Sequence, residues 1–345
     1  MKLAVIGSGK IVHEALFAIS YVKEIEIKAI FVRPHSREKG MELAEKYGIG
    51  QVYTDYAALL EKAQVDAVYI GLVNSAHYAY AREALLAGKH VILEKPFTST
   101  AAEAADLASL ARDRGRYILE AITNIHGPVF KKLQEWLPLI GTPRIHQGNF
   151  SQFSSRYRDY LEGRVSPAFD PALSGGALYD INLYNIYMAA ALYGMPEKAL
   201  YFPNRGFNGV DTSGIAILSY PGLTAALTGA KDADSPCFTF VQGEKGWIRV
   251  LGKPNYPAEI EMEYWDETKP DVPSSSGGWD RAMIREHFIP QEVPHRMVPE
   301  FAEFARIIDT QDQDGAERLS GCSLTVMEIL ERARKSAGIV FGIDG

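Results

Sequence analysis

Val91-Ile92-Leu93-Glu94-Lys95-Pro96 is the stretch of sequence that decides the fold. Its three apolar residues are typical of a short strand that is buried on both faces. Pro96 ends the strand, because proline has no N–H to continue the hydrogen-bond ladder. Residues just beyond the carboxyl end of such a strand lie in the crevice where open α/β sheets bind ligands. The stretch therefore predicts that Glu94 and Lys95 lie at the mouth of a site; the alternative is a surface turn with an ion pair.

The residues around this strand alternate between strand and helix patterns. We expect strands at residues 3–6, 26–32, 65–72, 90–93 and 117–120, and helices at residues 11–22, 37–47, 76–87 and 100–114. Such alternation indicates a parallel sheet with right-handed crossovers. Residues 1–122 are therefore predicted to form a Rossmann dinucleotide-binding domain of the α/β class.

From about residue 121 the pattern changes to period-2 runs joined by short Gly or Pro turns. These runs lie at residues 144–153, 199–203, 212–220, 224–230, 238–242, 247–251 and 258–264, and helices are expected at residues 123–139, 175–192, 299–310 and 319–341. The pattern predicts an open, mostly antiparallel sheet with one covered face. Residues 123–345 are thus predicted to form an α+β domain for substrate binding and oligomerisation, whose last helix packs back on the first domain. Residues 266–279 are expected to be a polar loop of low order.

Composition limits the function classes. The 345 residues favour two domains, and the net charge of −7 argues against a general binder of nucleic acid or anionic membranes. Cys237 and Cys322 are too few and too far apart for a disulfide framework or a zinc site. The sequence has no apolar run long enough for a membrane span, and the N-terminal apolar run is too short for a signal peptide. We expect a cytoplasmic protein with no bound metal.

Gly7-Ser8-Gly9 lies between the first predicted strand and helix, where a glycine-rich fingerprint indicates dinucleotide binding. The first glycine makes the tight turn, and the second lets the backbone approach a pyrophosphate held on the helix N-terminus at Lys10 and Ile11. The third fingerprint position holds Val12 rather than Gly or Ala, so the motif is incomplete. The alternative is a turn with a structural role only.

The residues at the end of the second strand indicate whether the cofactor ribose carries a 2′-hydroxyl or a 2′-phosphate. A ribose 2′-hydroxyl calls for a carboxylate there and a 2′-phosphate for a guanidinium. Residues 31–37 contain no Asp or Glu, whereas Arg33 and Arg37 can bracket a phosphate and Ser36 can donate to it. We therefore predict NADP, with NAD as the alternative. Two solvated arginines are the other interpretation.

The segment after the third long strand supplies further candidates. Leu72 closes that strand, and Asn74 can cap the next helix and face the cofactor. His77 falls in the first turn of that helix, where a lone histidine more often has a packing or capping role. With Glu94 and Lys95, these three residues complete the predicted cofactor site.

A second group of candidates follows Gly175-Gly176. In a helix, Asp180 and Tyr184 lie on one face, whereas Asn182 points away from them. The paired glycines allow the helix to start close to another backbone. A phenol beside an ammonium suits carbonyl chemistry: cationic Lys95 would lower the pKa of Tyr184, and the phenol would exchange the proton. The alternative is that Tyr184 is an ordinary core tyrosine.

Taken in order, these motifs resemble those of the Gfo/Idh/MocA oxidoreductases over essentially the full length of the chain. The resemblance rests on the GxG turn, the 73–77 segment, Glu94-Lys95-Pro96, Glu120-Ala121 and Gly175-Gly176-Ala177-Leu178-Tyr179-Asp180. The resemblance implies an NAD or NADP cofactor, Lys95 between the nicotinamide and the substrate, and Asp180 orienting the substrate. It also implies a cis Lys95–Pro96 bond and dimers or tetramers formed through the broad sheet.

Two positions depart from the family pattern. Tyr184 stands where the inositol-dehydrogenase-like branch has a histidine, which is similar to the branch of dihydrodiol dehydrogenase and glucose-fructose oxidoreductase, where a tyrosine is the acid/base. Ile125 stands where many relatives have an arginine that contacts substrate, and Asn124 or His126 is the candidate replacement.

The sequence thus predicts an NAD(P)-dependent dehydrogenase or reductase for a sugar, cyclic polyol or dihydrodiol. Lys95, Tyr184 and Asp180 are the predicted catalytic residues, and these three with Asn124 are the predicted substrate contacts. The alternative is a non-catalytic sensor of the same fold that binds a dinucleotide.

Overall fold

The N-terminal domain contains a parallel sheet of six strands in the order β3-β2-β1-β4-β5-β6. The protein is described by a computed structural model over residues 1–344. The strands are β1 (Lys2–Ile6), β2 (Glu26–Phe31), β3 (Gln51–Tyr53), β4 (Ala67–Ile70), β5 (His90–Glu94) and β6 (Ile118–Ala121). The helices are α1 (Lys10–Ile19), α2 (Arg37–Tyr47), α3 (Tyr56–Lys62), α4 (His77–Leu86) and α5 (Ala101–Asp113). The strand order reverses between β1 and β4, which is where such sheets bind their ligands.

The C-terminal domain contains a sheet of eight strands in the order β16-β13-β12-β11-β7-β10-β9-β8. Its strands are β7 (Pro143–Ser151), β8 (Lys198–Arg205), β9 (Asp211–Tyr220), β10 (Leu223–Ala230), β11 (Phe238–Gly243), β12 (Gly246–Lys253), β13 (Tyr256–Trp265) and β16 (Met283–Phe288). Only β7 and β10 pair in parallel, so the expectation of a mostly antiparallel sheet is confirmed. The helices of this part are α6 (Pro128–Trp136), α7 (Tyr157–Leu161), α8 (Leu183–Tyr193), α9 (Val298–Thr310) and α10 (Gln313–Ser336).

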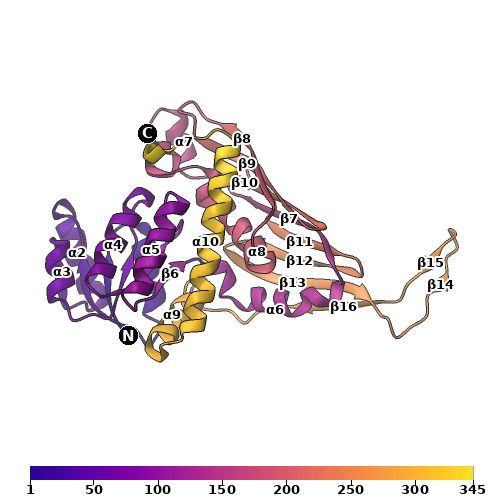
Figure 1. The fold of residues 1–345 in the computed structure, drawn as a ribbon, viewed down its shortest axis with the longest axis horizontal. Coiled ribbons are helices and arrows are strands. Elements are labelled where there is room, and N and C mark those ends of the chain that lie inside the picture. Colours follow the sequence, from indigo (N-terminus) through magenta and orange to yellow (C-terminus); the bar gives the residue numbers. More distant parts are fainter. Residues whose placement is uncertain (345) are drawn as a thin grey trace.

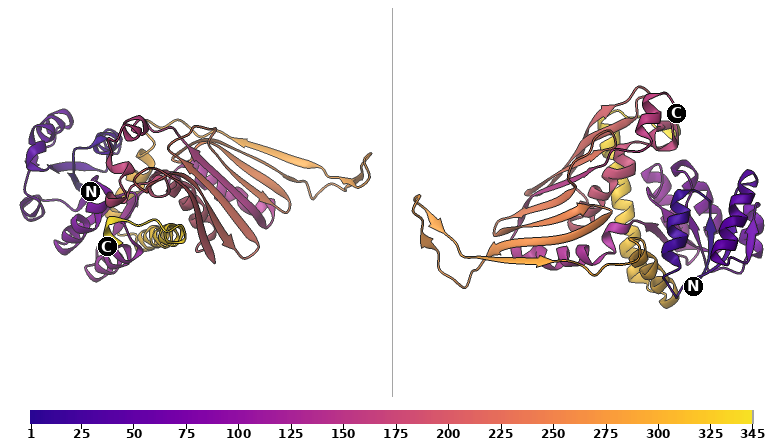
Figure 2. Two further views of the ribbon diagram at one scale, coloured as in Figure 1. Left: turned by 90° about the horizontal axis from the view of Figure 1, so that it is seen from above. Right: turned by 180° about the vertical axis from the view of Figure 1, so that it is seen from behind.

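Helices α6, α8 and α10 lie on one face of the eight-stranded sheet, and the other face is open (Figures 1 and 2). Alternating residues account for this difference. In β8, for example, Ala199 and Tyr201 are buried under the helices, whereas Leu200 and Phe202 are exposed on the open face. The long helix α10 runs between the two domains and contacts α5 and β6 on one side and α8 and β8 on the other (Figure 1).

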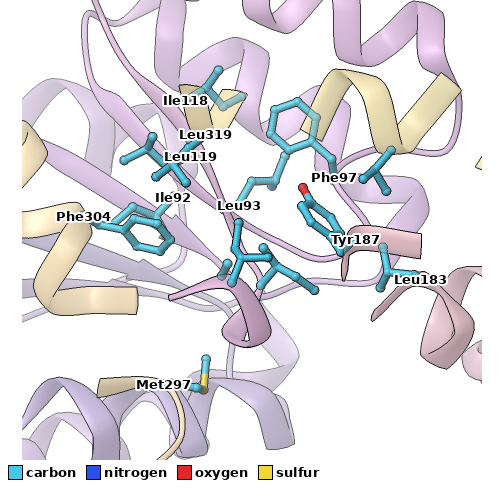
Figure 3. Packing of buried hydrophobic residues seen from close by; sticks show 14 of the residues in the cluster. Ile92, Leu93, Phe97, Ile118, Leu119, Leu183, Tyr187, Met297, Phe304 and Leu319 are labelled. Carbon is cyan, nitrogen blue, oxygen red and sulfur yellow. The ribbon is translucent and has the colours of Figure 1, made fainter. Parts of the chain in front are cut away.

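A continuous apolar core joins the domains. Figure 3 shows side chains of β5 and β6, such as Ile92 and Leu119, near Phe304 of α9 and Leu319 of α10. These residues are buried, and burial of apolar area on this scale is the main term that stabilises such a junction. Strand β5, which ends in Glu94, therefore belongs to the part of the N-terminal sheet that packs on the C-terminal helices.

Several predicted boundaries differ from the structure. Short elements were missed: β3 and α3 fill residues 48–64, and β16 forms an edge strand. The 266–279 segment contains the two-residue strand β14 (Val272–Pro273) and ends at β15 (Trp279–Asp280), which pair into an arm that projects from the sheet (Figure 1).

Helix starts were also misplaced, and their first residues explain why. The expected 123–139 helix starts only at Pro128, a residue favoured in the first turn. The last helix starts at Gln313 instead of 319, because the Asp312 side chain caps it by accepting from Gly315 N at 2.9 Å.

None of the helices within residues 1–344 combines the length and the apolar character that crossing a membrane requires.

Candidate active site

A cavity of about 680 Å³ lies at the carboxyl ends of β1, β2, β4 and β5. It extends from the loop after β2 to Lys95 and Asp180, and therefore spans both domains. Most of the predicted cofactor residues line it: Gly7, Ser8, Gly9, Lys10, Ile11, Arg33, Ser36, Leu72, Asn74, Glu94 and Lys95. Arg37 and His77 are not among its lining residues.

The glycine turn fits a dinucleotide. Gly7 has a φ of 120°, and a Cβ added to it would lie 2.6 Å from the Gly71 carbonyl oxygen. Only glycine can therefore make this turn at such a close approach. Val12, which breaks the fingerprint, is fully buried, and a Cβ on Gly71 would lie 2.8 Å from its Cγ2. In the complete fingerprint, a third glycine on the helix allows the helix and strand to pack closely. Here Gly71, which directly follows β4, leaves that room instead.

The ribose end of the cavity is basic. Arg33, His35, Ser36 and Lys39 line it. Lys39, which was not among the predicted residues, lines the cavity, whereas the predicted Arg37 does not. Ser36 and Lys39 are three residues apart at the start of α2 and share one face, whereas Arg37 is turned away from it by one helix position. The Arg33 and Lys39 cations, with the Ser36 hydroxyl, suit a 2′-phosphate.

His77 was predicted to bind cofactor, but the structure gives it another position. It is fully buried, with Nδ1 at 2.9 Å from the Pro96 carbonyl oxygen and Nε2 at 3.2 Å from the Leu72 carbonyl oxygen. Burial lowers its pKa. The imidazole therefore connects the loops after β4 and β5, and it is not among the residues that line the cavity. The sequence held no signal for this, because the two partners are main-chain atoms.

Glu94 is almost completely buried at the end of β5 and accepts a hydrogen bond from the Tyr69 hydroxyl at 2.7 Å. Burial raises the pKa of its carboxyl to about 7, although the Tyr69 hydrogen bond and the Lys95 ammonium both act to lower it. Glu94 therefore titrates near neutral pH.

Replacing Glu94 with glutamine should change how stability depends on pH. The folded protein binds this proton more tightly than the unfolded chain, so wild-type stability falls as pH rises from about 4.5 to about 7. At about 1.4 kcal/mol per pKa unit, the free energy of unfolding of Glu94→Gln relative to wild type should rise by about 3 kcal/mol between pH 5 and pH 8. Urea unfolding at the two pH values measures it. Glu303→Gln is the matched control. Burial acts to raise the pKa of Glu303, but His126 and Arg318 lower it by more, to about 2, so the difference in stability between this variant and wild type should be the same at both pH values. If the difference for Glu94→Gln were also the same at both pH values, the prediction would be contradicted.

Lys95, Asp180 and Lys231 form a linear ion-pair cluster at the inner end of the cavity. Lys95 Nζ lies 2.8 Å from Asp180 Oδ1 and also donates to the Asp180 carbonyl oxygen at 2.9 Å. Lys231 Nζ lies 2.8 Å from Asp180 Oδ2. Lys231 was not predicted from the sequence; it directly follows β10, and this position at a strand end was its only signal.

The cluster fixes the charge state of its members. Burial acts to raise the pKa of Asp180, but Lys231 and Lys95 lower it by more, so Asp180 is a carboxylate. Burial acts to lower the pKa of Lys95, but Asp180 and Tyr184 raise it by more, so Lys95 is an ammonium. Lys95 is thus a fixed positive charge beside the cavity.

Tyr184 lies next to this ammonium. Lys95 Nζ is 5.5 Å from the centre of the Tyr184 ring, and the ring also makes an edge contact with Phe150. Asn124 Nδ2 donates to the Tyr184 carbonyl oxygen at 2.8 Å. Burial raises the pKa of Tyr184 to about 12, although Lys95 acts to lower it. The expected effect of Lys95 on the phenol is present, but burial outweighs it, so the phenol is neutral at pH 7.

Asp180 is positioned by a local departure from α-helical geometry. The expected 175–192 helix begins instead as a π-helix over Leu178–Asn182 and continues as α8. Gly176 has a φ of 130°, and a Cβ on it would lie 2.0 Å from Asp211 Oδ1. Asp211 Oδ2 in turn accepts from Leu178 N at 2.6 Å. The glycine thus lets a buried carboxylate of β9 cap the turn that presents Asp180.

The other candidate substrate contacts are held by neighbouring groups. Asn124 is buried, and its side-chain amide donates to the Tyr184 carbonyl oxygen. His126 is buried too, with Nδ1 at 2.6 Å from Glu303 Oε2 of α9, and does not line the cavity. Within residues 1–344, no three or more His, Cys, Asp or Glu side chains are grouped so that they can hold a metal ion.

Comparison with known proteins identifies the family of this chain. Residues 1–121 match the model of the oxidoreductase family with an NAD-binding Rossmann fold, and residues 139–249 match the GFO/IDH/MocA C-terminal domain. The chain is 33% identical to scyllo-inositol 2-dehydrogenase (NADP(+)) of Bacillus subtilis, over 100% of this chain and 99% of that protein. The chain belongs to the Gfo/Idh/MocA oxidoreductases. The family resemblance seen in the sequence, the fold class and the prediction of a dehydrogenase or reductase are all confirmed.

Other Gfo/Idh/MocA relatives show the range of substrates in the family. Trans-1,2-dihydrobenzene-1,2-diol dehydrogenase of Sus scrofa is 27% identical over 80% of this chain and 82% of that protein. A solved 3-ketoreductase from Actinomadura kijaniata, in complex with NADP and TDP-benzene, has a TM-score of 0.78 and 25% identity, and 97% of each chain is covered. The cis Lys95–Pro96 bond expected from the family is present.

Proposed function

We propose that this protein is an NADP-dependent oxidoreductase that interconverts a hydroxyl-bearing carbon and a carbonyl carbon of a sugar, cyclic polyol or dihydrodiol. The observation that carries the proposal is the position of Asp180 between the ammonium groups of Lys95 and Lys231, beside Tyr184. The cluster lies at the inner end of a cavity that begins at the glycine turn. The retained ammonium and phenol have no evident use in a non-catalytic sensor.

NADP, when bound, supplies a nicotinamide C4 that accepts a hydride from the substrate carbon or returns it. In the reductive direction, the Tyr184 phenol donates its proton to the substrate oxygen, while the Lys95 ammonium stabilises the negative charge that develops there. Asp180 keeps Lys95 charged and fixes its position. In the oxidative direction the Tyr184 phenol first loses its proton to solvent, and the phenolate then accepts the proton of the substrate hydroxyl. We propose Lys95, Tyr184 and Asp180 as the catalytic residues and Asn124 as a further substrate contact.

A redox assay tests the proposed function. NADPH absorbance at 340 nm is followed with a panel of keto-sugars and inosose-like ketones, and NADP+ reduction with free polyols, dihydrodiols and nucleotide-linked sugars. At least one compound should change the redox state of the cofactor with saturation kinetics. Tight NADPH binding with no redox change across the panel would support a sensor instead.

Replacing Arg33 with alanine should weaken binding of NADPH selectively. We propose that Arg33, Ser36 and Lys39 hold the 2′-phosphate. Loss of one charge-assisted contact should raise the Kd of NADPH by about 10- to 100-fold and leave that of NADH nearly unchanged. Arg37→Ala is the matched control, because Arg37 is exposed and does not line the cavity. Fluorescence titration measures the Kd of both cofactors. Equal losses of affinity for NADPH and NADH would argue against a phosphate site.

We further propose a homo-oligomer that forms through the open face of the eight-stranded sheet. Leu200, Phe202 and Ile215 are exposed there, and Phe202 and Ile215 are cross-strand neighbours. An exposed apolar patch of this kind usually marks an interface. We also propose a cytoplasmic location, supported by the two unpaired cysteines, and a domain boundary between residues 122 and 123, just after β6.

A further inference from the structure

Residues 152–175 of the C-terminal domain form part of the wall of the cofactor cavity. The segment follows β7 and leads to the π-helix that carries Asp180. Helix α7 belongs to it and lies above the N-terminal helices in the view of Figure 1. Five residues of the segment line the same cavity as the glycine turn after β1: Arg156, Pro167, Ala168, Leu173 and Gly175. The cofactor cavity is therefore shared between the two domains along this segment.

The segment has a small apolar core of its own. Tyr160 and Phe169 are buried in a cluster separate from the main core, and their ring centres lie 5.0 Å apart. Tyr157, which directly follows Arg156, packs against this cluster with its ring centre 5.8 Å from that of Phe169. Packing of its neighbour thus fixes the main chain of Arg156, although the Arg156 side chain itself is exposed.

Hydrogen bonds join the segment to the loops of the N-terminal domain and to the ion-pair cluster. Asn74 Nδ2, in the loop after β4, donates to the Ser174 carbonyl oxygen at 2.9 Å. The Ser174 hydroxyl donates to Ser99 Oγ, in the loop after β5, at 2.7 Å. Lys231 Nζ donates to the Ala168 carbonyl oxygen. The segment is thus held at the cavity by both domains.

Arg156 is a cation of the cavity that has no partner within residues 1–344. Arg164 of the same segment, by contrast, pairs with two neighbouring carboxylates. The other cations of the cavity have tasks already: Lys95 pairs with Asp180, and the residues after β2 are proposed to hold the 2′-phosphate. The guanidinium of Arg156 is therefore free to bind an anion in the cavity.

The pyrophosphate is the anionic group that NADP carries besides its 2′-phosphate, and NAD carries it too. The N-terminal domain offers it the glycine turn, the start of α1, whose first turn has no acidic residue, and the single cation of Lys10. A pyrophosphate carries a negative charge on each phosphoryl group, so one cation leaves it incompletely neutralised. The planar guanidinium of Arg156 matches phosphate oxygens in a bidentate manner. The uncharged substrates proposed above offer this arginine no anion.

We propose that Arg156 binds the cofactor pyrophosphate from the C-terminal domain, so that a bound NADP or NAD joins residues 152–175 to the N-terminal domain. This inference rests on the proposed oxidoreductase function, and it adds a residue of the substrate-binding domain to the cofactor site.

Replacing Arg156 with methionine should weaken binding of both cofactors by the same factor. Loss of a charge-assisted contact with the shared pyrophosphate should raise the Kd of NADPH and of NADH by about 10- to 100-fold each, as measured by fluorescence titration. The Kd of adenosine 2′-monophosphate, measured by competition with NADPH, should change by less than about threefold, because this ligand has no pyrophosphate. A loss for NADPH alone, or for neither cofactor, would overturn the proposal.

Two further variants separate charge from packing. Arg158→Met is the matched control, because Arg158 is also exposed on α7 but does not line the cavity; both Kd values should stay within about twofold of wild type. Arg156→Lys keeps the positive charge, so its Kd values should lie within about threefold of wild type. A loss of affinity in Arg156→Lys as large as in Arg156→Met would mean that packing is responsible, and would overturn the proposal.

Hydrogen exchange provides a readout that does not depend on affinity or activity. At saturating NADPH, amide exchange in residues 152–166 of the wild-type protein should be slower by about fivefold or more than in the free protein. In Arg156→Met, saturated with NADPH at a higher concentration, this protection should be absent. Equal protection in the two proteins would show that the cofactor does not hold the segment through Arg156.

The outcomes for the arginine and for the proposed function are distinct. Absence of NADPH and NADH binding by the wild-type protein would overturn the proposed function itself. If the wild-type protein binds and oxidises NADPH, but Arg156→Met raises only the KM of an anionic substrate and leaves both cofactor Kd values unchanged, Arg156 is a substrate contact. That result would overturn the inference and leave the proposed function intact.

Discussion

Lys95→Ala is expected to lower kcat by about 10³-fold while the Kd of NADPH changes by less than about threefold. The ammonium is held in place by the carboxylate and the carbonyl oxygen of Asp180, 85 positions further along the chain. Its pKa, which burial acts to lower, is raised overall by Asp180 and Tyr184, so it is charged at neutral pH. A fixed positive charge stabilises a developing alkoxide but adds little to the binding of an uncharged nicotinamide. Stopped-flow single turnovers with saturating NADPH give the rate, and fluorescence titration gives the Kd.

The fold should tolerate the loss of Lys95. Removal of one partner from a buried ion pair usually leaves an uncompensated charge, but Asp180 keeps Lys231 at 2.8 Å. Lys89→Ala is the matched control, because Lys89 precedes β5 at its other end and donates to the Val65 carbonyl oxygen. It should keep the wild-type kcat. Full activity of Lys95→Ala would show that the ammonium has no part in the chemistry.

Tyr184→Phe should lower kcat by about 10²- to 10⁴-fold, the usual range for loss of a positioned general acid. Phenylalanine keeps the ring contact with Phe150 and the main-chain hydrogen bond from Asn124, so only the proton-transfer group is lost. With a pKa of about 12, raised by burial against the effect of Lys95, the phenol is protonated at neutral pH. Deprotonation of Tyr184 should therefore not lower the rate of reduction between pH 6 and 9. The rate of oxidation should rise with pH.

Tyr187→Phe is the matched control for Tyr184→Phe. Neither tyrosine is among the residues that line the cavity. Tyr187 is also buried on α8, but its hydroxyl donates to Glu120 and lies 2.7 Å from Ser323 Oγ, whereas the Tyr184 ring lies beside Lys95. The variant should lose about 1–3 kcal/mol of stability, because it leaves buried partners unsatisfied, and should keep its kcat. Equal kinetic losses in the two variants would mean that Tyr184 acts through packing and not through its proton.

The sequence was sufficient for the parts of the site that follow from local periodicity. Glu94 and Lys95 lie where a buried parallel strand ends, as the periodicity predicted. Lys95 also lies close to Asp180 and Tyr184, but a π-helix over Leu178–Asn182, and not the expected α-helix, presents Asp180. The glycine turn at Gly7 followed from its place between strand and helix.

The missed features depend on contacts between distant segments. Lys231 reaches Asp180 because the π-helix over Leu178–Asn182 packs on β10, where Asn182 Nδ2 donates to the Leu227 carbonyl oxygen at 2.9 Å. No local spacing in the sequence encodes that contact. His77 was assigned to the cofactor because its partners, the carbonyl groups of Leu72 and Pro96, leave no signal in the side-chain pattern. The start of α2 at Arg37 was predicted correctly, but Arg37 was chosen because a guanidinium suits a phosphate, and that criterion does not show that Lys39 lines the cavity and Arg37 does not.

A crystal structure of the protein with NADP and a slowly reacting polyol tests the central claim most directly. The account predicts that one substrate oxygen lies within about 3.2 Å of both Lys95 Nζ and the Tyr184 hydroxyl, with its carbon facing the nicotinamide C4. A substrate oxygen bound by other groups, or a nicotinamide ring that lies away from Lys95, would contradict it.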